Sequence, residues 1–373
     1  MRTPRARWRL WHGAVGLALG AWLALLGLTG SLLVFYPALD AALNPALRWT
    51  PGDGCVQRWQ PVLDALRAAE PQRAGPWRIE LPEQGCGIVH ARYLQPAESQ
   101  GAHFRPLVLH LHPREHTVLA RRFWGDSVMT WLYDLHYTLL LGGTGLWLVG
   151  GMGLVGLFMT GAGLRLWWPA TPHQWRQAWR CKPGAVRQRR TWDRHRLVGL
   201  YSAPVMLVLA LTGTVLAWPS WIEPLIGRVS PPMPLAMAHS VPRPGTMITL
   251  DQALAAAQAH FPQAQPRWVD TPDGPEGSFR VRLQQPGEPS ERFPKSFVRI
   301  DAWSGAVLAA RDARDQPAGD ALLAWMHPLH NGEAFGLVGR WVVLLCGGAW
   351  PWLAWSGWRR WRDRHTARRP LTR

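Results

Sequence analysis

Four histidines stand at matched positions in the two halves of this 373-residue sequence. The apolar stretches that begin at His12 and at His195 align without gaps, because their identical residues all lie 183 positions apart (195 − 12). These residues are His12, Gly16, Thr29 and Gly30 in the first stretch and His195, Gly199, Thr212 and Gly213 in the second. Imidazole is a common metal ligand, so a histidine repeated in this way is a candidate ligand of a metal centre.

A second pair of histidines follows the same rule. His136 and His330 lie 194 positions apart (330 − 136). Glycines at this spacing follow them, namely Gly142 and Gly145 in one half and Gly336 and Gly339 in the other. The sequence is therefore interpreted as two copies of one membrane unit, and each copy contributes one histidine to each pair.

The paired histidines lie at the ends of apolar stretches. Hydrophobic residues make up 47% of the chain and charged residues only 17%, whereas soluble proteins carry about 25% charged residues. Four stretches are long enough to cross a bilayer, which takes about 20 residues; they lie near His12–Tyr36, Leu139–Leu164, Leu197–Trp218 and Phe335–Trp358. The first exceeds the roughly 7–15 apolar residues of a cleavable signal peptide and is expected to remain as an anchor.

The distribution of charge predicts the topology. The net charge is +17, and the basic residues gather at Arg2–Arg9, Arg176–Arg196 and Arg359–Arg373. Four spans place these three clusters on one side, which the positive-inside rule makes cytoplasmic. Both termini are therefore expected in the cytoplasm. No nucleic-acid-binding motif accompanies the basic residues, so their expected partner is the lipid bilayer and not a nucleic acid.

This topology predicts a membrane α-helical fold, with four transmembrane helices as a duplicated two-helix unit and two small α+β modules outside. The expected segments are 1–36 (cytoplasmic N-terminus and first span), 37–131 (first outer module), 132–168 (second span), 169–194 (basic cytoplasmic loop), 195–219 (third span), 220–325 (linker and second outer module), 326–361 (fourth span) and 362–373 (basic cytoplasmic tail).

The two outer segments show the same order of elements. In the first, a helix is expected at 60–69 and strands at 78–81, 87–93 and 107–111. In the second, a Pro-rich extended linker at 229–245 precedes a helix at 250–261, which Thr249 caps. Strands at 278–283, 296–300 and 306–309 follow it. Each segment is therefore expected to form one helix followed by a small antiparallel sheet.

Cysteines and further histidines lie in the first outer segment. Cys55 and Cys86 share the oxidising side of the membrane and could form a disulfide, although the sequence does not show how close they lie. His110 and His112 alternate onto one strand face, with His116 beyond the turn. They are interpreted as a solvated strand end, the alternative being a metal or substrate patch.

Sequence motifs give the chain a specific resemblance. The segment ITLDQALAAAQAHFP from Ile248 and the strand VRIDAWSGAVL from Val298 resemble a PepSY domain. Asp134-Leu135-His136 and Pro328-Leu329-His330-Asn331-Gly332 are similar to the histidine motifs that open spans in the PepSY-associated transmembrane family of bacterial iron-regulated membrane proteins. Asn331 stands where the family usually has Thr. The resemblance covers nearly the full chain and implies a multi-pass protein of the bacterial inner membrane.

The same resemblance implies haem held by membrane histidines and ferric-siderophore reductase activity. Two histidines from different helices can occupy both axial positions of a haem iron, which suits electron transfer. Two haems b are therefore expected, with His12 and His195 at the cytoplasmic side and His136 and His330 near the outer face. Gly16 and Gly199 lie one turn after their histidines and are expected to let a porphyrin approach the backbone.

Alternatives to these assignments stay open at this point. His327 lies three residues before His330 and could be the ligand instead. Histidines at span ends could also simply hydrogen-bond to lipid headgroups. One metal site of four histidines is disfavoured because the two pairs lie at opposite ends of the spans, about 25 Å apart from His12 to Thr29 at 1.5 Å per residue. No metal beyond haem iron is expected.

The sequence thus predicts a transmembrane haem-b oxidoreductase that carries electrons from the cytoplasmic side to an outer acceptor, a ferric siderophore by resemblance. No flavin or nicotinamide motif is present, so the donor is expected to be a cytoplasmic protein or a quinol, and no catalytic residue is assigned. Two rival hypotheses remain. In one, the protein is a non-enzymatic PepSY regulator or binder of peptidases or ligands. In the other, its haems pass electrons to a periplasmic redox protein.

Overall fold

The computed structural model describes residues 3–234 and 238–366 and divides into two compact units. The helical unit comprises Met1–Phe35, Tyr133–Ser220 and Leu329–Arg373. The sheet unit comprises Tyr36–Leu132 and Trp221–Pro328. Each unit is therefore assembled from both halves of the chain.

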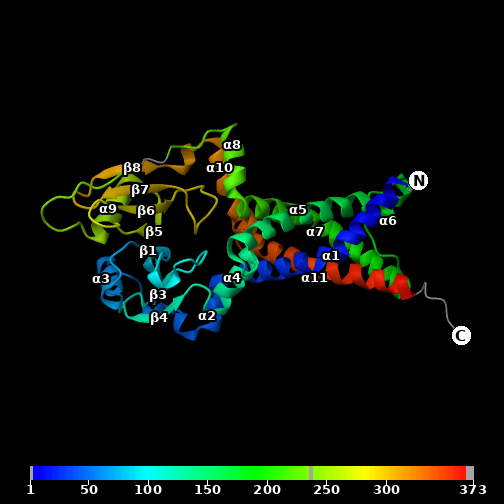
Figure 1. The fold of residues 1–373 in the computed structure, drawn as a ribbon, viewed down its shortest axis with the longest axis horizontal. Helices are drawn as coiled ribbons and strands as arrows, with labels where there is room; N and C mark the ends of the chain where they lie inside the picture. The colour runs from blue at the N-terminus through cyan, green and yellow to red at the C-terminus, as the bar shows by residue number, and fades with distance from the viewer. Residues whose placement is uncertain (1–2, 235–237, 367–373) are drawn as a thin grey trace. The chain divides into compact units, whose positions relative to one another are not determined.

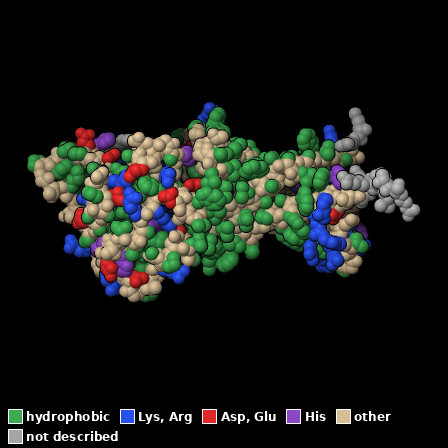
Figure 2. Space-filling view, turned by 60° about the horizontal axis from the view of Figure 1, so that its bottom comes forward, with side chains coloured by type: hydrophobic (Ala, Val, Ile, Leu, Met, Phe, Trp, Pro, Cys, Tyr) green, Lys and Arg blue, Asp and Glu red, His purple; other side chains and the backbone are tan. Residues whose placement is uncertain are grey.

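Among the described residues, four long helices are apolar enough to cross a membrane. They are α1 (Pro4–Leu33), α5 (Gly142–Trp167), α7 (Arg187–Ala217) and α11 (Gly336–Thr366). They form a bundle (Figure 1), and hydrophobic side chains cover its length (Figure 2). The prediction of four apolar spanning helices is confirmed.

The ends of the bundle differ in charge. Lysine and arginine side chains gather at one end (Figure 2), where α1 and α7 begin and α5 and α11 end (Figure 1). Helix α1 begins with residues typical of a helix N-terminus. Pro4 is its first residue, and the Thr3 hydroxyl accepts a hydrogen bond from the backbone N–H of Ala6. The described residues of the three basic clusters predicted from the sequence thus lie on helices and loops of one bundle end (Figure 2).

Small residues let the long helices approach one another. A methyl group on Gly27 of α1 would lie 2.5 Å from the carbonyl oxygen of Gly347 in α11. A methyl group on Gly153 of α5 would lie 2.1 Å from the hydroxyl of Thr214 in α7. Such contacts are typical of membrane helix pairs, in which backbones pack closely through small residues. The helices accordingly pack mainly as α1 with α11 and α5 with α7.

The chain also forms shorter helices. They are α2 (Tyr36–Leu43), α4 (Val128–Thr138), α6 (Pro172–Ala178), α8 (Pro219–Gly227) and α10 (Ala318–Asn331), with short 3-10 helices at Pro45–Leu47, Pro51–Asp53, Glu83–Gly85, Ala97–Ser99, Ala313–Asp315 and Glu333–Phe335. The predicted segments 132–168 and 326–361 each contain a break rather than one helix. Leu139 and Leu140 have positive φ angles of 51° and 60° between α4 and α5, and Gly332 has a φ of 79° after α10.

The described part of the sheet unit forms one eight-stranded antiparallel sheet in the order β4-β3-β2-β1-β5-β6-β7-β8. Its strands are β1 (Trp77–Glu80), β2 (Val89–Tyr93), β3 (Leu107–Leu111), β4 (Val118–Phe123), β5 (Gln265–Asp270), β6 (Ser278–Gln284), β7 (Phe297–Asp301) and β8 (Val307–Arg311). Two small separate modules were expected. The structure instead pairs β1 with β5, and this pairing joins them into one sheet.

The two faces of the sheet have different chemistry. Helices α3 (Gln60–Ala69) and α9 (Leu250–His260) pack on one face and share an apolar core with residues such as Leu63, Ile79 and Val281. The alternation of buried and less buried residues, clearest in β6, sends the intervening side chains to the other face. That second face is polar and rich in arginine.

The predicted helices of the sheet unit match the observed ones closely, but two of the observed strands were not predicted. The helix at 60–69 was predicted with its observed bounds, and the second helix ends one residue before its predicted end at 261. Strands β4 and β5 were not predicted. Most of the linker at 229–245 lacks regular secondary structure, and residues 235–237 of it lie outside the described residues.

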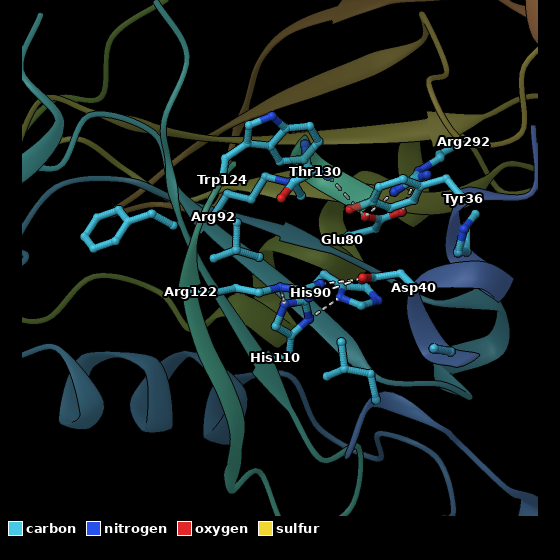
Figure 3. Close-up of a pocket in the computed structure, with 15 residues that line it drawn as sticks. Tyr36, Asp40, Glu80, His90, Arg92, His110, Arg122, Trp124, Thr130 and Arg292 are labelled. Atoms are coloured by element: carbon cyan, nitrogen blue, oxygen red, sulfur yellow. Dashed lines mark hydrogen bonds and ion pairs between the residues drawn. The ribbon is translucent and has the colours of Figure 1, made fainter. Parts of the chain in front are cut away.

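His110 does not belong to a solvated strand end. It lies in the middle of the sheet, is only 2% exposed, and its Nδ1 atom is 2.7 Å from that of His90 on β2 (Figure 3). The prediction was wrong because β4 pairs with β3 and makes β3 an inner strand. His112 lies nearby, where its Nδ1 accepts hydrogen bonds from the backbone of Arg114 and Glu115.

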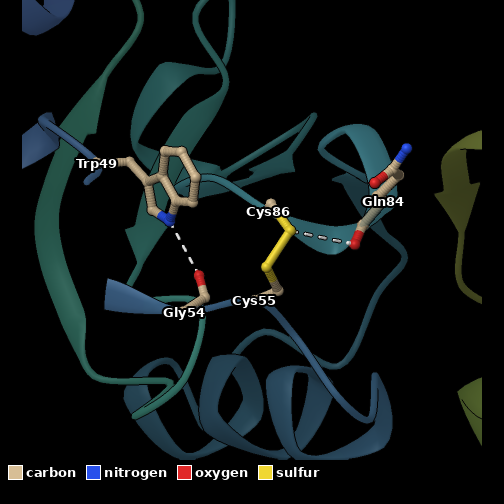
Figure 4. The surroundings of a disulfide bond; sticks show 5 residues. All are labelled: Trp49, Gly54, Cys55, Gln84 and Cys86. Atoms are coloured by element: carbon tan, nitrogen blue, oxygen red, sulfur yellow. Dashed lines mark hydrogen bonds between the residues drawn. A yellow bond between two sulfur atoms is a disulfide. The ribbon is translucent and has the colours of Figure 1, made fainter. Parts of the chain in front are cut away.

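A disulfide joins Cys55 and Cys86 in the sheet unit (Figure 4). It links the segment before α3 to the loop between β1 and β2. Beside it, the indole of Trp49 donates a 2.9 Å hydrogen bond to the carbonyl of Gly54. The structure leaves Cys181 and Cys346 as free thiols.

Candidate functional site

The helical unit brings His136 of α4 and His330 of α10 together. Their ring centroids lie 6.2 Å apart. The hydroxyl of Thr29 lies 3.0 Å from Nδ1 of His136, and the hydroxyl of Thr212 lies 2.9 Å from Nδ1 of His330. Each histidine is therefore positioned by a threonine near the end of a long helix, α1 or α7.

These hydrogen bonds define which ring nitrogen carries the proton. The hydroxyl of Thr29 donates to the carbonyl of Leu25, and that of Thr212 donates to the carbonyl of Val208. With its proton on that carbonyl, each hydroxyl oxygen accepts from Nδ1–H of the histidine. A ring N–H donated to a neighbouring group is typical of histidines that ligate a metal through the other ring nitrogen.

Glycines allow the two rings to lie against the long helices. A methyl group on Gly30 would lie 2.7 Å from Cε1 of His136, and one on Gly213 would lie 3.0 Å from Cε1 of His330. A side chain at either position would collide with the imidazole. The Thr-Gly dipeptide that appears in both halves of the sequence thus forms a cradle for one histidine ring in each half.

His12 of α1 and His195 of α7 form the second pair in the described helical unit. Their ring centroids lie 6.3 Å apart, with the ring planes at 88°. Nδ1 of His195 lies 2.7 Å from the hydroxyl of Ser356, which itself donates to the carbonyl of Leu353. His195 therefore also carries its proton on Nδ1. The described residues give His12 no such hydroxyl partner.

The second pair also faces matched positions in α5 and α11. A methyl group on Gly163 would lie 3.6 Å from Cε1 of His12, and one on Gly357 would lie 3.7 Å from Cε1 of His195. These glycines lie 194 positions apart (357 − 163), the spacing that relates His136 to His330. At that spacing Ser356 corresponds to Ala162, which explains why His12 lacks the hydroxyl that His195 has.

The separation of the rings fits a shared iron. Metal–imidazole bonds of about 2.0 Å, with each ring centroid about 1.1 Å behind its nitrogen, place two coordinating rings about 6.2 Å apart. The observed centroid separations are 6.2 and 6.3 Å. Two imidazoles at this separation form the donor set of a bis-histidine haem. The residues of both pairs therefore fit such a group.

The structure also locates the other residues singled out in the sequence. His327 packs edge-on against Phe293 in the sheet unit, with ring centroids 5.0 Å apart, whereas His330 faces His136. A methyl group on Gly16 would meet Cε of Met159 at 3.0 Å, and one on Gly199 would meet Leu353 at 3.7 Å. The glycines that face the rings are those of the Thr-Gly dipeptides and of α5 and α11.

The sequence contained a signal for some of the positioning residues. Thr29 and Thr212 stood out as identical residues of the repeat, but no role followed from identity alone. Their role depends on helix packing, which turns each threonine toward a histidine of a different helix. Ser356 has no counterpart in the other half of the chain, so the repeat could not reveal it.

These features define a membrane protein whose apolar helices position two histidine pairs, with an attached eight-stranded sheet. Residues 9–364 match the family model described as the PepSY-associated TM region. Because the match spans nearly the whole chain, the protein belongs to this family. No curated protein matches the chain.

Proposed function

We propose that this protein is a transmembrane haem-b oxidoreductase with two haems, one held by His12 and His195 and the other by His136 and His330. The observation that carries this proposal is the separation of the rings in the two histidine pairs, 6.2 and 6.3 Å between centroids, with the hydroxyls of Thr29 and Thr212 at Nδ1 of His136 and His330. When bound between such a pair, haem supplies one-electron redox chemistry.

The chain's own residues perform the positioning. Thr29, Thr212 and Ser356 hold three of the four imidazoles in the tautomer that can ligate iron. The Thr-Gly cradles hold two rings against α1 and α7. Two histidine ligands on one haem iron would leave no site for oxygen or other small ligands, so the bound group would supply electron transfer and not oxygen chemistry.

The proposed route of electrons runs from the cytoplasm outward. The basic end of the bundle carries the His12–His195 pair, and the positive-inside rule assigns that end to the cytoplasm. The matched contacts in the two halves support a duplicated two-helix unit as its origin. About 25 Å of helix rise separates His12 from Thr29, so the two pairs serve opposite faces of an inner membrane.

The proposed acceptor is a ferric siderophore on the periplasmic side, where the PepSY-like modules lie. Siderophores bind the hard ferric ion through oxygen ligands, and reduction to the softer ferrous ion weakens that binding. The electron donor is a cytoplasmic protein or a quinol.

Visible spectroscopy of the purified full-length protein tests the proposal. We expect a sharp Soret band, an α-band on reduction, and about two haems per chain. His195→Ala should remove the haem of the basic end only, and His330→Ala the haem of the other pair only. His260→Ala, at the end of α9, is the matched control and should retain both. A colourless protein, or loss of both haems in each single variant, would contradict the proposal.

The acceptor needs a separate assay. Chemically reduced protein should be reoxidised by ferric siderophores, with release of ferrous ion to a ferrous-specific chelator. If a periplasmic redox protein reoxidised the protein but no ferric chelate did, the haem assignment would stand and a ferric siderophore would be excluded as the acceptor.

A further inference from the structure

The polar face of the sheet contains a cavity of about 190 Å³ that is formed entirely by residues of the sheet unit (Figure 3). A single water needs only about 10–15 Å³ of such volume, so this cavity is large enough for a small organic ligand. Tyr36, Phe123 and Trp124 supply aromatic walls, and three arginines, two histidines and two carboxylates supply the polar ones.

The register of the sheet concentrates positive charge on this face. Cross-strand partners form one continuous row of residues over seven strands, which reads Arg122, Val108, Arg92, Arg78, Asp270, Arg280 and Arg299. Like charges directly opposite each other destabilise a sheet. Five arginines and one aspartate in a row therefore make this face strongly attractive to an anion.

Two of the cavity arginines are held rigidly. The guanidinium of Arg92 stacks between Trp124 and Trp268, 5.4 and 5.1 Å from the two ring centroids. That of Arg292 lies 5.8 Å from the ring centroid of Tyr36. Stacked guanidinium groups lose little entropy on binding and match planar carboxylates with two parallel hydrogen bonds.

A chain of hydrogen bonds fixes the two histidines of the cavity as neutral donors. Nε of Arg122 donates to Nε2 of His110 at 3.0 Å, so the proton of His110 sits on Nδ1 and is donated to Nδ1 of His90 at 2.7 Å. The proton of His90 is therefore on Nε2. Burial lowers the pKa of His90 to about 4 and that of His110 to about 2, which keeps both neutral.

The carboxylates of the cavity already have cationic partners. Asp40 pairs with Arg122, and Glu80 pairs with Arg292 at 3.0 Å and with Arg92 at 3.8 Å. Burial raises the pKa of Glu80, but the nearby arginines, Arg292 first, outweigh it and hold the pKa below its ordinary value. Both acids thus serve to orient arginines, and three arginines against two carboxylates leave the lining cationic.

We infer that this cavity binds a small organic polycarboxylate. The carboxylates of the ligand would pair with Arg92 and Arg292, the Nε2–H of His90 and the phenol of Tyr36 would donate to it, and the aromatic walls favour an organic ligand over inorganic phosphate. All lining residues belong to the sheet unit, so this inference does not rest on the proposed haem function, and a protein without haem would still bind the ligand.

Isothermal titration of the full-length protein in detergent with citrate, in a buffer free of other carboxylates, tests the inference. We expect saturable binding at one site per chain. Arg92→Gln should weaken it about tenfold or more, because a buried charge-assisted pair is lost while Glu80 keeps Arg292 as a partner. Tyr36→Phe removes a single hydroxyl and should weaken it several-fold. Arg314→Gln is the matched control, since Arg314 is half exposed and pairs only locally with Asp312.

Thermal melts show whether each variant is folded, and Tyr36→Phe keeps the test decisive if Arg92→Gln does not fold. Absence of saturable citrate binding would overturn the inference, as would equal affinity of wild type, Arg92→Gln and Tyr36→Phe. Inorganic phosphate binding as tightly as citrate would overturn the assignment to a carboxylate ligand.

Discussion

Histidine pairs occur in both units, but their surroundings differ. In the helical unit the ring centroids of His136 and His330 lie 6.2 Å apart, and hydroxyl groups hold Nδ1. In the sheet unit those of His90 and His110 lie 4.8 Å apart, and the rings hydrogen-bond directly to each other. The first spacing leaves room for a metal atom between the rings, and the second leaves none.

The comparison shows that the partner of the second ring nitrogen decides what a histidine pair can do. A threonine that donates its own proton to a helix carbonyl accepts the Nδ1 proton and leaves Nε2 to a metal. An arginine that donates to Nε2, as Arg122 does to His110, occupies the nitrogen that a metal would need. The same side chain therefore belongs to the proposed redox centre in one unit and to the proposed anion cavity in the other.

The largest effect is expected from filling the cradle of the helical unit. Gly30→Ala would place a methyl group 2.7 Å from Cε1 of His136 and force the ring away from its hydrogen bond to Thr29. We expect loss of more than half of the haem at this pair, measured by haem content and the Soret band. Gly13→Ala is the control on the same helix, because a methyl group there meets no atom of the described structure within 4 Å. Equal haem content in both variants would show that the cradle does not position the ligand.

A smaller effect is expected from protonation of the sheet pair. The pKa values of His90 and His110 in the folded protein, about 4 and about 2, lie below the value of about 6.5 in an unfolded chain. The unfolded state therefore takes up more protons as the pH falls, so stability is full above about pH 6.5 and is lost toward pH 4. Burial is the main cause that keeps the pair neutral, and Arg292, Arg92 and Arg122 add to it, whereas the carboxylate of Glu80 raises the pKa of His90.

For two histidines, the loss between pH 7 and pH 5 amounts to about 4 kcal/mol. Thermal melts across this range measure the loss. In His110→Gln, the slope of the free energy of unfolding against pH should correspond to about one proton fewer. If wild type and His110→Gln gave the same slope, the pair would not be buried and neutral.

The smallest effect is expected at the one hydroxyl that has no counterpart. Ser356→Ala removes the partner of Nδ1 of His195 and makes this histidine resemble His12. Haem should remain bound, and its midpoint potential should rise by about 20–60 mV, because a hydrogen bond of 0.5–1.5 kcal/mol no longer makes the imidazole more basic. Spectroscopic redox titration measures the shift, and Ser356→Thr, which keeps the hydroxyl, is the control. An unchanged or lowered potential in Ser356→Ala would exclude this role.

The sequence predicted the helical unit better than the sheet unit for a physical reason. Twenty consecutive apolar residues can hardly be anything but a helix in a bilayer, and a repeat with constant spacing identifies equivalent positions. The four histidines of the two pairs were therefore named correctly as neighbours in two pairs. Their hydroxyl partners were not, because Thr29 and Ser356 meet their histidines only through packing between helices.

The cavity of the sheet unit was beyond sequence reasoning. Its arginines come from β2, β4 and the loop before β7, and one of the three strand pairings that bring cavity residues together, β3 with β4, involves an unpredicted strand. Without β4, strand β3 was an edge and His110 a solvent-exposed residue. A cross-strand row of charges cannot be recognised until the register of every strand in it is known.

The pairing of β1 with β5 has a consequence for biogenesis. Arg78 of β1 meets Asp270 of β5 across 192 residues of chain, which include α5 and α7. During synthesis, the edge of β1 that faces β5 therefore stays open until α5, α7 and β5 have been made. Open strand edges promote association with other chains, so the first half of the sheet passes through a stage at which it can pair wrongly.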